Sequence, residues 1–431
     1  MNNIPENWLI LTQYYPPELG APPIRLRSMV RVLRQRGFDI EVLTALPNYP
    51  AGKIFPGYEG RWSVGETIDG VPVRRTWVYA GTGKSAKIRL ANYLSFTFSS
   101  LWASLTGTRP DIMFVESQPL SLGLVAVLMK WLRGVPYIYN IPDLQIEAAQ
   151  QLGFIRNLKF LRIAGAMEDF FMRHSWKVST VTHAFIAHFE RHGIPRSQLS
   201  FLPNGADSDF LRPLPPSSRL LERWNLHGKK VLLYVGTHAF YHGLDTLIDA
   251  AAHLQQERDL VLLMVGDGPE KPRLKQLSQD RGLSNIIFAQ SPYEEMHELY
   301  SIAYLSIATL RRLDVARYMR LSKIFPSLSC GVPVIYSGIG EAADLLERER
   351  CGLTVPPEQP EALAQAISRL VADPMLRDRM GAAGRALVER EYSWSVIVQE
   401  WLNEIGMPTT GQLGKRGSRK SDLSVANSKT S

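Results

Sequence analysis

The chain has 431 residues, of which 45% are hydrophobic and 21% charged, the balance of a globular protein with two or three buried cores. Its two cysteines, Cys330 and Cys351, are too few for a disulfide framework, and we expect Cys330 in a buried turn. We find no signal-peptide pattern and no apolar run long enough to cross a bilayer. The sequence therefore argues against a secreted, membrane-spanning or disordered protein and predicts a cytoplasmic one.

Positive charge is concentrated in the first half of the chain. The formal net charge is +8, and residues 1–200 hold 22 Lys and Arg against 14 Asp and Glu. Residues 201–400 are slightly acidic, with 22 against 25. A basic half suits a polyanionic partner, such as an anionic membrane surface or nucleic acid, although a solvated basic face without a partner has the same composition.

The first half reads as strands alternating with helices. The helical pattern is clearest at 22–36, where Leu26, Met29, Val30 and Leu33 share one apolar face. Such alternation is typical of parallel βαβ units. The strands predicted in this half are 8–12, 39–44, 112–115 and 137–140.

The same pattern starts again after residue 205. A helix is predicted at 244–254, and the proline- and serine-rich segment 212–218 reads as a linker. The strands predicted in this half are 230–235, 261–265, 286–288, 305–308 and 334–336.

We therefore expect an α/β protein with two doubly wound, Rossmann-like domains that face a ligand cleft. The N-terminal domain is predicted over 1–205 and the C-terminal domain over 206–385. A helix at 386–405 is expected to pack back on the N-terminal domain. The Gly-, Ser- and Lys-rich tail, 406–431, is expected to be disordered.

Glycine-bearing turns after strands are the first candidate ligand sites. Gly20 follows the first strand of the first half, and Gly236 follows the first strand of the second half. Glycine there lets the backbone approach a phosphate, and the next helix offers unpaired N–H groups. By contrast, Gly81-Thr-Gly-Lys-Ser85 resembles only half of a phosphate-binding P-loop, because Val78 stands where the pattern needs glycine, and we expect a basic surface loop there.

A series of motifs resembles the family 4 glycosyltransferases of GT-B fold, and among them a group that includes proposed L-fucosamine transferases of bacterial surface-polysaccharide assembly. The resemblance covers roughly residues 8–400, and it rests on the order and spacing of the motifs rather than on any one of them. The motifs are Tyr14-Tyr-Pro-Pro-Glu-Leu-Gly20, Pro47-Asn-Tyr-Pro50, Phe55-Pro-Gly-Tyr58, Ile141-Pro-Asp-Leu144, Leu202-Pro-Asn-Gly205, Tyr234-Val-Gly-Thr237, His242-Gly-Leu244, Gly266-Asp-Gly-Pro269, Ser322-Lys-Ile-Phe325, Ser329-Cys-Gly-Val-Pro-Val334 and Gly340-Glu-Ala-Ala343.

The resemblance implies a GT-B enzyme with the acceptor on the N-terminal domain and a nucleotide-sugar donor on the C-terminal domain. It implies retention of anomeric configuration, no bound metal or other cofactor, and a lipid-linked or saccharide acceptor rather than nucleic acid. Without a metal, protein cations and backbone dipoles must stabilise the diphosphate leaving group. Lys323 matches the family's donor-site lysine, Arg311 lies upstream, and Glu341 resembles another donor-contacting position.

Asp143 is the leading candidate for catalysis. It follows a predicted strand and resembles the acidic or histidine residue that the family places beside the reacting sugar carbon. A carboxylate there could orient or deprotonate the acceptor hydroxyl. Asp143 could instead cap the following helix, and Glu147 is then the next candidate. Glu341 likewise suits a helix N-terminus, and Arg311 a solvated loop.

The sequence departs from the family pattern at four positions. Pro326 and Tyr318 stand where many family members have two glutamates. The glutamate that Pro326 replaces normally binds the nucleotide ribose. Thr237 and His242 stand where relatives often have Arg and Lys, and a histidine charge depends on pH. A GT-B-fold nucleotide-sugar epimerase and a degenerate, non-catalytic nucleotide-sugar-binding protein therefore remain alternatives to a transferase.

Two further patterns allow either a purely structural or a functional interpretation. His183, His188 and His192 do not share one helical face, which argues against a metal site. The aromatic segment 92–105 follows Lys84, Lys87 and Arg89, and it fits an interfacial helix on the inner face of the cell membrane and a buried core helix equally well.

Overall fold

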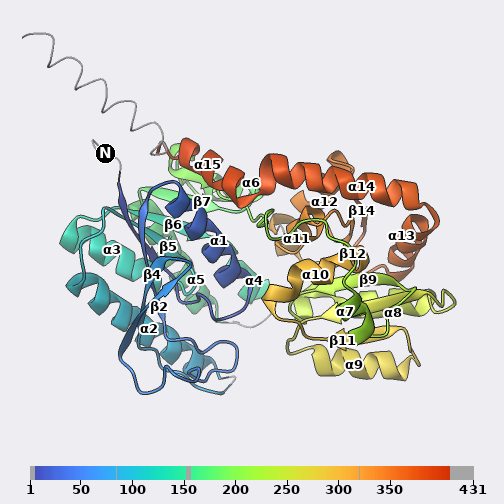
Figure 1. Ribbon diagram of the computed structural model, residues 1–431. Helices are drawn as coiled ribbons and strands as arrows, with labels where there is room; N and C mark the ends of the chain where they lie inside the picture. Colours follow the sequence, from blue (N-terminus) through green and yellow to red (C-terminus); the bar gives the residue numbers. More distant parts are fainter. Residues whose placement is uncertain (1–4, 84, 152–156, 320, 408–431) are drawn as a thin grey trace, which may run out of the picture. The chain divides into compact units, whose positions relative to one another are not determined.

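The computed structural model describes residues 5–83, 85–151, 157–319 and 321–407 (Figure 1). The chain divides into two compact units. Unit 1 contains the residues up to Leu202 and those from Ile397 onwards, and unit 2 contains Pro203–Val396. Most of the tail for which disorder was expected, 408–431, lies outside the described residues.

Unit 1 is built on an eight-stranded sheet in the order β3-β4-β2-β1-β5-β6-β7-β8. Every neighbouring pair is parallel except β3 and β4, which form an antiparallel pair at one edge. The strand order reverses between β1 and β5, as expected of a doubly wound sheet. The strands are β1 Asn7–Leu11, β2 Asp39–Ala45, β3 Ser63–Ile68, β4 Val71–Thr76, β5 Ile112–Glu116, β6 Tyr137–Ile141, β7 Lys177–Thr180 and β8 Leu199–Phe201.

The helices of unit 1 connect these strands. The predicted helix at 22–36 is α1, and the aromatic segment 92–105 lies in α2. The loop before α2 is largely exposed, as expected for 81–85, although Lys84 lies outside the described residues. The helices are α1 Ala21–Gln35, α2 Ala86–Thr106, α3 Leu122–Arg133, α4 Gln145–Gln151, α5 Leu158–His174 and α6 His183–Arg191.

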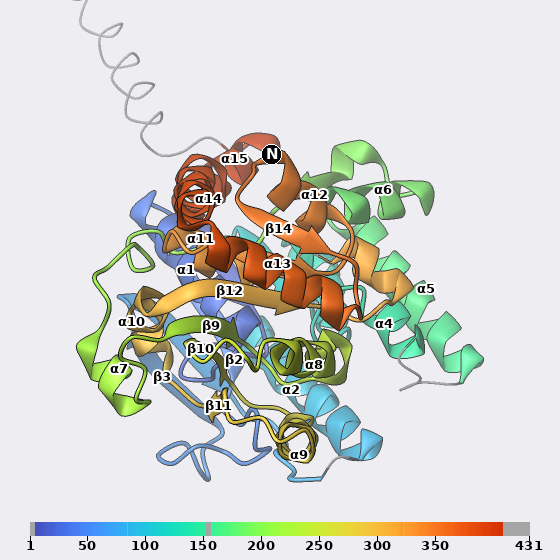
Figure 2. The ribbon, with the colours of Figure 1, turned by 90° about the vertical axis from the view of Figure 1, so that its right-hand side faces the viewer.

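Unit 2 is built on a parallel six-stranded sheet in the order β11-β10-β9-β12-β13-β14, which is also doubly wound. Alternate residues of β9 feed two cores: Val231 and Leu233 face one, and Leu232 and Tyr234 face the other, which α8 and α13 cover (Figure 2). The strands are β9 Lys230–Val235, β10 Leu260–Val265, β11 Ile286–Ala289, β12 Ala303–Thr309, β13 Val334–Ser337 and β14 Gly352–Val355.

Eight α-helices of six to fourteen residues accompany the described sheet of unit 2. Cys330 is buried where α11 ends and the chain turns toward β13, which confirms its predicted place. The helices are α7 Ser218–Arg223, α8 Leu244–His253, α9 Lys271–Asp280, α10 Met296–Ser301, α11 Ile324–Ser329, α12 Glu341–Arg348, α13 Pro360–Ala372 and α14 Pro374–Leu387.

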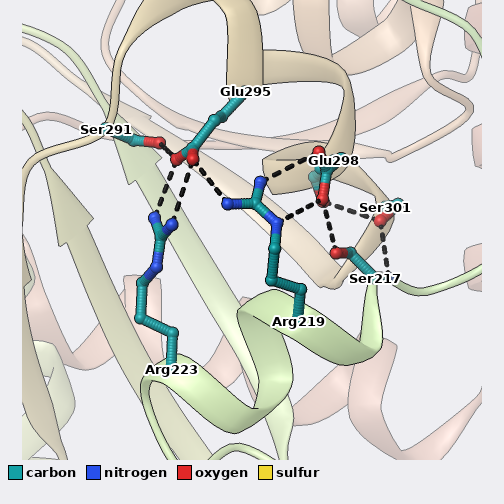
Figure 3. A network of polar contacts seen from close by, with 7 residues as sticks. All are labelled: Ser217, Arg219, Arg223, Ser291, Glu295, Glu298 and Ser301. Carbon is teal, nitrogen blue, oxygen red and sulfur yellow. Dashed lines mark hydrogen bonds and ion pairs between the residues drawn. The ribbon is translucent and has the colours of Figure 1, made fainter.

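The segment 212–218 lies within unit 2. The prediction, made from its composition, that it links two domains is therefore wrong. A polar network fastens it and α7 to α10 (Figure 3). Ser217 Oγ donates to Glu298, and Arg219 forms ion pairs with Glu295 and Glu298 at 2.7 and 2.9 Å. Arg223 pairs with Glu295 as well, at 2.8 Å, and these hydrogen bonds hold the pKa of the Glu295 carboxyl far below its ordinary value.

The last helix, α15 (Trp394–Glu404), carries its largest buried side chain into unit 1. The Trp401 ring packs edge-on against Trp8 and Phe114, with ring centroids 6.1 and 5.8 Å apart. Its indole N–H donates a hydrogen bond of 2.9 Å to Ser179 Oγ. The chain therefore returns from unit 2 to complete the core of unit 1.

We predict that Trp401→Ala lowers the free energy of unfolding by about 3–5 kcal/mol, because it opens a cavity in this core and removes the hydrogen bond from the indole to Ser179. Urea denaturation followed by circular dichroism measures the change. Trp102→Ala is the matched control, because Trp102 is 58% exposed and should change stability by less than about 0.5 kcal/mol. Equal effects of the two substitutions would contradict the role given to Trp401.

Candidate functional site

The carboxyl edge of the unit 2 sheet gathers several of the predicted donor-binding residues. Strands β9 and β12 are neighbours at the point where the strand order reverses, the usual ligand position in such sheets. Gly236 follows β9, and Arg311 follows β12 two residues after its end. Both residues lie in loops. The sheet therefore fixes where each loop begins, and the loop conformation determines the position of the residue.

The loops after β9 and β10 lie in unusually close contact. Gly236 has φ +148° and Gly266 has φ +142°, backbone conformations that residues other than glycine rarely adopt. A Cβ on Gly266 would lie 2.0 Å from the Gly236 carbonyl oxygen. The Gly236 N–H donates to Val265 O and the His238 N–H to Asp267 O, at 3.0 and 2.8 Å. Glycine at 236 and 266 is thus a steric requirement of the site.

Lys323 lies against the Gly236 loop. A Cβ on Gly236 would be 3.0 Å from the Lys323 Nζ. The amine donates a 3.0 Å hydrogen bond to Tyr234 Oη, and Nζ is 4.5 Å from the centre of that ring. Desolvation lowers the pKa of Lys323 to about 7, although the residue is partly open to solvent. Among the described residues, no carboxylate pairs with this amine.

Two histidines line the same loop. His242 lies 3.4 Å from the Lys323 amine through Nε2, and desolvation followed by the Lys323 charge lowers its pKa well below the ordinary value. His238 is fully buried, and desolvation lowers its pKa to about 4. Both ring nitrogens of His238 lack a hydrogen-bond partner within the described part of the chain. At neutral pH both imidazoles are therefore uncharged, and His242 does not replace a lysine charge.

Arg311, unlike Lys323, is held by acidic partners. Its guanidinium pairs with Asp245 at 2.6 Å and Glu358 at 2.9 Å, and Nε donates to the Phe240 carbonyl. These carboxylates neutralise the arginine, and the pair with Asp245 fastens the loop after β12 to α8. Arg311 thus lies at the predicted edge with its charge already compensated.

The two remaining predicted donor residues of unit 2 lie at the ends of strands. Thr237 is exposed next to Gly236, and its carbonyl accepts a 2.8 Å hydrogen bond from Tyr234 Oη. Glu341 is the first residue of α12, after the carboxyl end of β13. A carboxylate in the first turn interacts favourably with the helix dipole. Its geometry therefore fits the alternative structural interpretation as well as a donor contact.

In unit 1 the predicted residues lie at the carboxyl edge of the other sheet. Gly20 precedes α1, in the turn that follows β1. Asp143 follows β6 and accepts a 3.2 Å hydrogen bond from the Gln118 side-chain amide, which follows β5. The described residues give its carboxylate no helix-capping bond. Asp143 is exposed to solvent, yet desolvation by surrounding protein raises its pKa.

Glu147 lies on α4, one turn beyond Asp143. Its carboxylate is 3.7 Å from His188 Nε2 on α6. Desolvation lowers the pKa of His188 to about 4, so this imidazole is neutral at pH 7 and the contact is not an ion pair. His188 and His192 lie together, with ring centroids 4.3 Å apart, whereas His183 stacks on Phe201. Residues 5–407, where described, contain no group of three potential metal-ligating side chains.

A buried polar network lies beneath Asp143. Glu116, 1% exposed at the end of β5, accepts two hydrogen bonds from Arg25 Nη2, at 2.8 and 2.7 Å. Asn140 on β6 donates a third, at 2.8 Å. Desolvation raises the pKa of Glu116, and the Arg25 charge opposes the rise. The network ties α1, β5 and β6 together where Asp143 emerges.

Comparison with known proteins identifies the family. The model of glycosyl transferases group 1 matches residues 219–387, and that of the glycosyl transferase 4-like domain matches residues 20–205. The two matches lie on separate parts of the chain and together span most of it. The chain belongs to these GT-B glycosyltransferases. The predicted family, fold and enzyme class are thereby confirmed.

Some distant relatives and solved structures extend over nearly the whole chain. The putative colanic acid biosynthesis glycosyl transferase WcaI of Escherichia coli K12 is 25% identical over 91% of this chain and 97% of its own. Among solved structures, sucrose-phosphate synthase from Thermosynechococcus elongatus has a TM-score of 0.72, with 20% identity over 96% and 99% of the two chains. HepE of Anabaena, in complex with UDP-glucose, has a TM-score of 0.70, with 18% identity over 93% and 99%.

The sequence did not indicate several residues that lie at the carboxyl edges of the two sheets. The motifs include Tyr234 but indicate no role for it, and they do not single out His238 or the Arg25–Glu116 pair. The available signal was a polar residue at the end of an apolar strand, as Glu116 is in β5. Nothing local, however, links Lys323 to Tyr234, 89 residues away.

We predict that Arg25→Met destabilises the protein by about 3 kcal/mol or more, because it leaves the buried Glu116 carboxylate without its cation. Urea denaturation measures the loss. The double variant Arg25→Met, Glu116→Leu should recover most of the stability, since no buried charge remains. A double variant as unstable as the single one would show that the ion pair is not the source of the effect.

Proposed function

We propose that this glycosyltransferase moves a sugar from a nucleotide-sugar donor bound by unit 2 to a lipid-linked or saccharide acceptor in the assembly of a cell-surface polysaccharide. The observation that carries the donor assignment is the Lys323 amine, which lies beside the glycine loop without a carboxylate partner among the described residues. The name of WcaI supports the polysaccharide context, and the UDP-glucose complex of HepE supports the donor class.

Lys323 is proposed to stabilise the diphosphate leaving group. Arg311 is neutralised by two carboxylates, and the Lys271 amine donates to the Gly266 carbonyl at 2.7 Å. Within the described part of the chain, the polar contacts of the Lys323 amine are to uncharged groups, Tyr234 and His242. A cation in a desolvated position interacts strongly with the charge that develops on a leaving diphosphate, so this chemistry can proceed without a metal.

Asp143 is proposed to act at the acceptor or at the reacting sugar carbon. Its carboxylate is exposed, lies at the carboxyl edge of the unit 1 sheet and is oriented by Gln118. Family resemblance adds retention of configuration to the proposal. Glu147 is the second candidate.

Pro326 defines how this donor site differs from its relatives. It lies within α11, in the turn directly after Lys323, and offers neither a carboxylate nor an N–H group. Ribose recognition by a carboxylate at this position is therefore lost. We propose that the donor is held mainly through its diphosphate and sugar.

Donor affinity should fall as pH rises, because Lys323 loses its charge near pH 7. Above that pH the affinity for the donor should drop by about tenfold per pH unit, since binding must first take up a proton. Titration calorimetry with UDP-glucose and GDP-mannose from pH 6 to 9 measures this, after a thermal-shift screen has shown which donor binds.

Lys323→Arg and Lys323→Met are the controls for this titration. Arginine keeps its charge throughout the range, so the pH dependence should disappear while binding persists. Methionine should bind weakly at every pH. An unchanged pH profile in Lys323→Arg would remove Lys323 from donor binding.

Asp143→Asn should lower sugar transfer by about 10²-fold or more and leave donor affinity nearly unchanged, because the amide keeps the shape of the side chain and its bond from Gln118 but loses the charge. Transfer to a lipid-linked acceptor fraction, with radiolabelled donor, measures the first quantity, and calorimetry the second. Asp169→Asn, on α5, is the matched control. Near-normal transfer in Asp143→Asn would move the role to Glu147, and turnover of donor without any acceptor would favour an epimerase.

A further inference from the structure

Helix α2 exposes its large apolar residues and buries small polar ones, the reverse of an ordinary surface helix. Its outward residues are large and apolar: Leu90, Leu94, Phe98 and Trp102, at steps of four, are 50%, 52%, 62% and 58% exposed. Its buried face is mostly small and polar, with Thr97, Ser99, Ser100 and Ser104. Ordinary surface helices place the apolar stripe toward the core. The outward stripe of α2 is therefore not explained by folding of the unit.

The two neighbouring helices extend this apolar surface. Of the eighteen large hydrophobic residues that are exposed in the described part of the chain, twelve lie on α2, α3 and α5. The helices contact one another: Arg133 on α3 donates to the Ser104 carbonyl on α2, and Trp131 packs edge-on against Phe170 on α5 at 6.0 Å. Figure 1 shows α2 and α3 adjacent on unit 1. The exposed residues of α3 and α5 are Leu124, Trp131, Leu132, Leu158, Phe160, Ile163, Met167 and Phe170.

The same three helices carry an excess of positive charge. They contain seven basic residues, and none of the seven forms an ion pair with a carboxylate among the described residues. Of their two acids, Glu168 is buried, and desolvation raises its pKa to about 8, which leaves it uncharged at neutral pH. The basic residues are Lys87, Arg89, Lys130, Arg133, Lys159, Arg162 and Arg173.

The interleaving of apolar and basic side chains indicates which kind of partner this surface can bind. On α5, Lys159 and Arg162 alternate with Phe160 and Ile163 on the exposed side of one helix. The centre of a protein interface is depleted in lysine, so a second copy of the chain fits this surface poorly. An anionic bilayer surface accepts aromatic and aliphatic side chains below its headgroups and basic side chains among them.

We propose that the α2–α3–α5 face of unit 1 docks onto the surface of an anionic lipid bilayer. The protein binds there peripherally, because no described helix is long and apolar enough to cross a membrane. The stripe of α2 enters the interfacial region, and the basic residues contact lipid phosphates. The inference goes beyond the proposed sugar transfer, and its test needs neither donor nor acceptor.

Co-sedimentation of the full chain with vesicles tests the inference. Vesicles of phosphatidylglycerol and phosphatidylcholine should bind the protein, and pure phosphatidylcholine vesicles should bind it much more weakly. The double substitution Phe98→Ser, Trp102→Ser should lower the partition coefficient by about tenfold or more, because two apolar groups no longer leave water. The double substitution Lys159→Gln, Arg162→Gln should lower binding to anionic vesicles by about tenfold and weaken its salt dependence.

Trp62→Ser is the matched control, since Trp62 is 52% exposed on unit 1 but lies outside the three helices. It should bind vesicles as the wild type does, and thermal melting should show that all variants are folded. Quenching of tryptophan fluorescence by brominated lipid provides a second measurement, on the unaltered chain. Absence of binding to anionic vesicles, equal binding of the Phe98→Ser, Trp102→Ser variant, or a dimer in sedimentation velocity that this variant dissociates would overturn the proposal.

Discussion

The proposed donor site of this glycosyltransferase depends on one steric constraint, the contact between the loops that follow β9 and β10. A Cβ at Gly266 would lie 2.0 Å from the Gly236 carbonyl, so the two backbones can approach only without side chains. The space left at Gly236 receives the Lys323 amine, and Tyr234 orients it. The glycines thus fix where the positive charge lies, and desolvation in that place lowers its pKa to about 7.

Local patterns predicted the repeated strand–helix units well, because apolar periodicity is strong where a strand is buried on both faces. The sequence did not reveal β3, whose residues alternate between exposed and half-buried, nor β4, whose apolar run is broken by Arg74 and Arg75. It also did not reveal the three- and four-residue strands β7, β8 and β14. At the site, Gly236 and Lys323 were found from their motifs. Their juxtaposition was not, since only the doubly wound sheet brings the ends of distant loops together.

Charge and amphipathicity were harder to interpret than position. Arg311 was predicted beside the donor, but its compensation by Asp245 and Glu358 depends on partners 66 and 47 residues away. The aromatic segment of α2 fitted a core helix and an interfacial helix equally, because periodicity shows that one face is apolar and not which face points inward. The burial of Ser99 and Ser100, with Phe98 exposed, shows that the apolar face of α2 points outward.

Hydrogen exchange measured by mass spectrometry tests the central claim most directly, because it reports where the donor binds without requiring the acceptor. With a saturating nucleotide sugar, we predict slower exchange in residues 236–243, 266–270 and 321–325 of the wild-type chain, the loops that surround the Lys323 amine. The same ligand should protect these segments much less in Lys323→Met. Protection confined to unit 1, or protection of these loops that is unchanged in Lys323→Met, would contradict a donor site organised by Gly236 and Lys323.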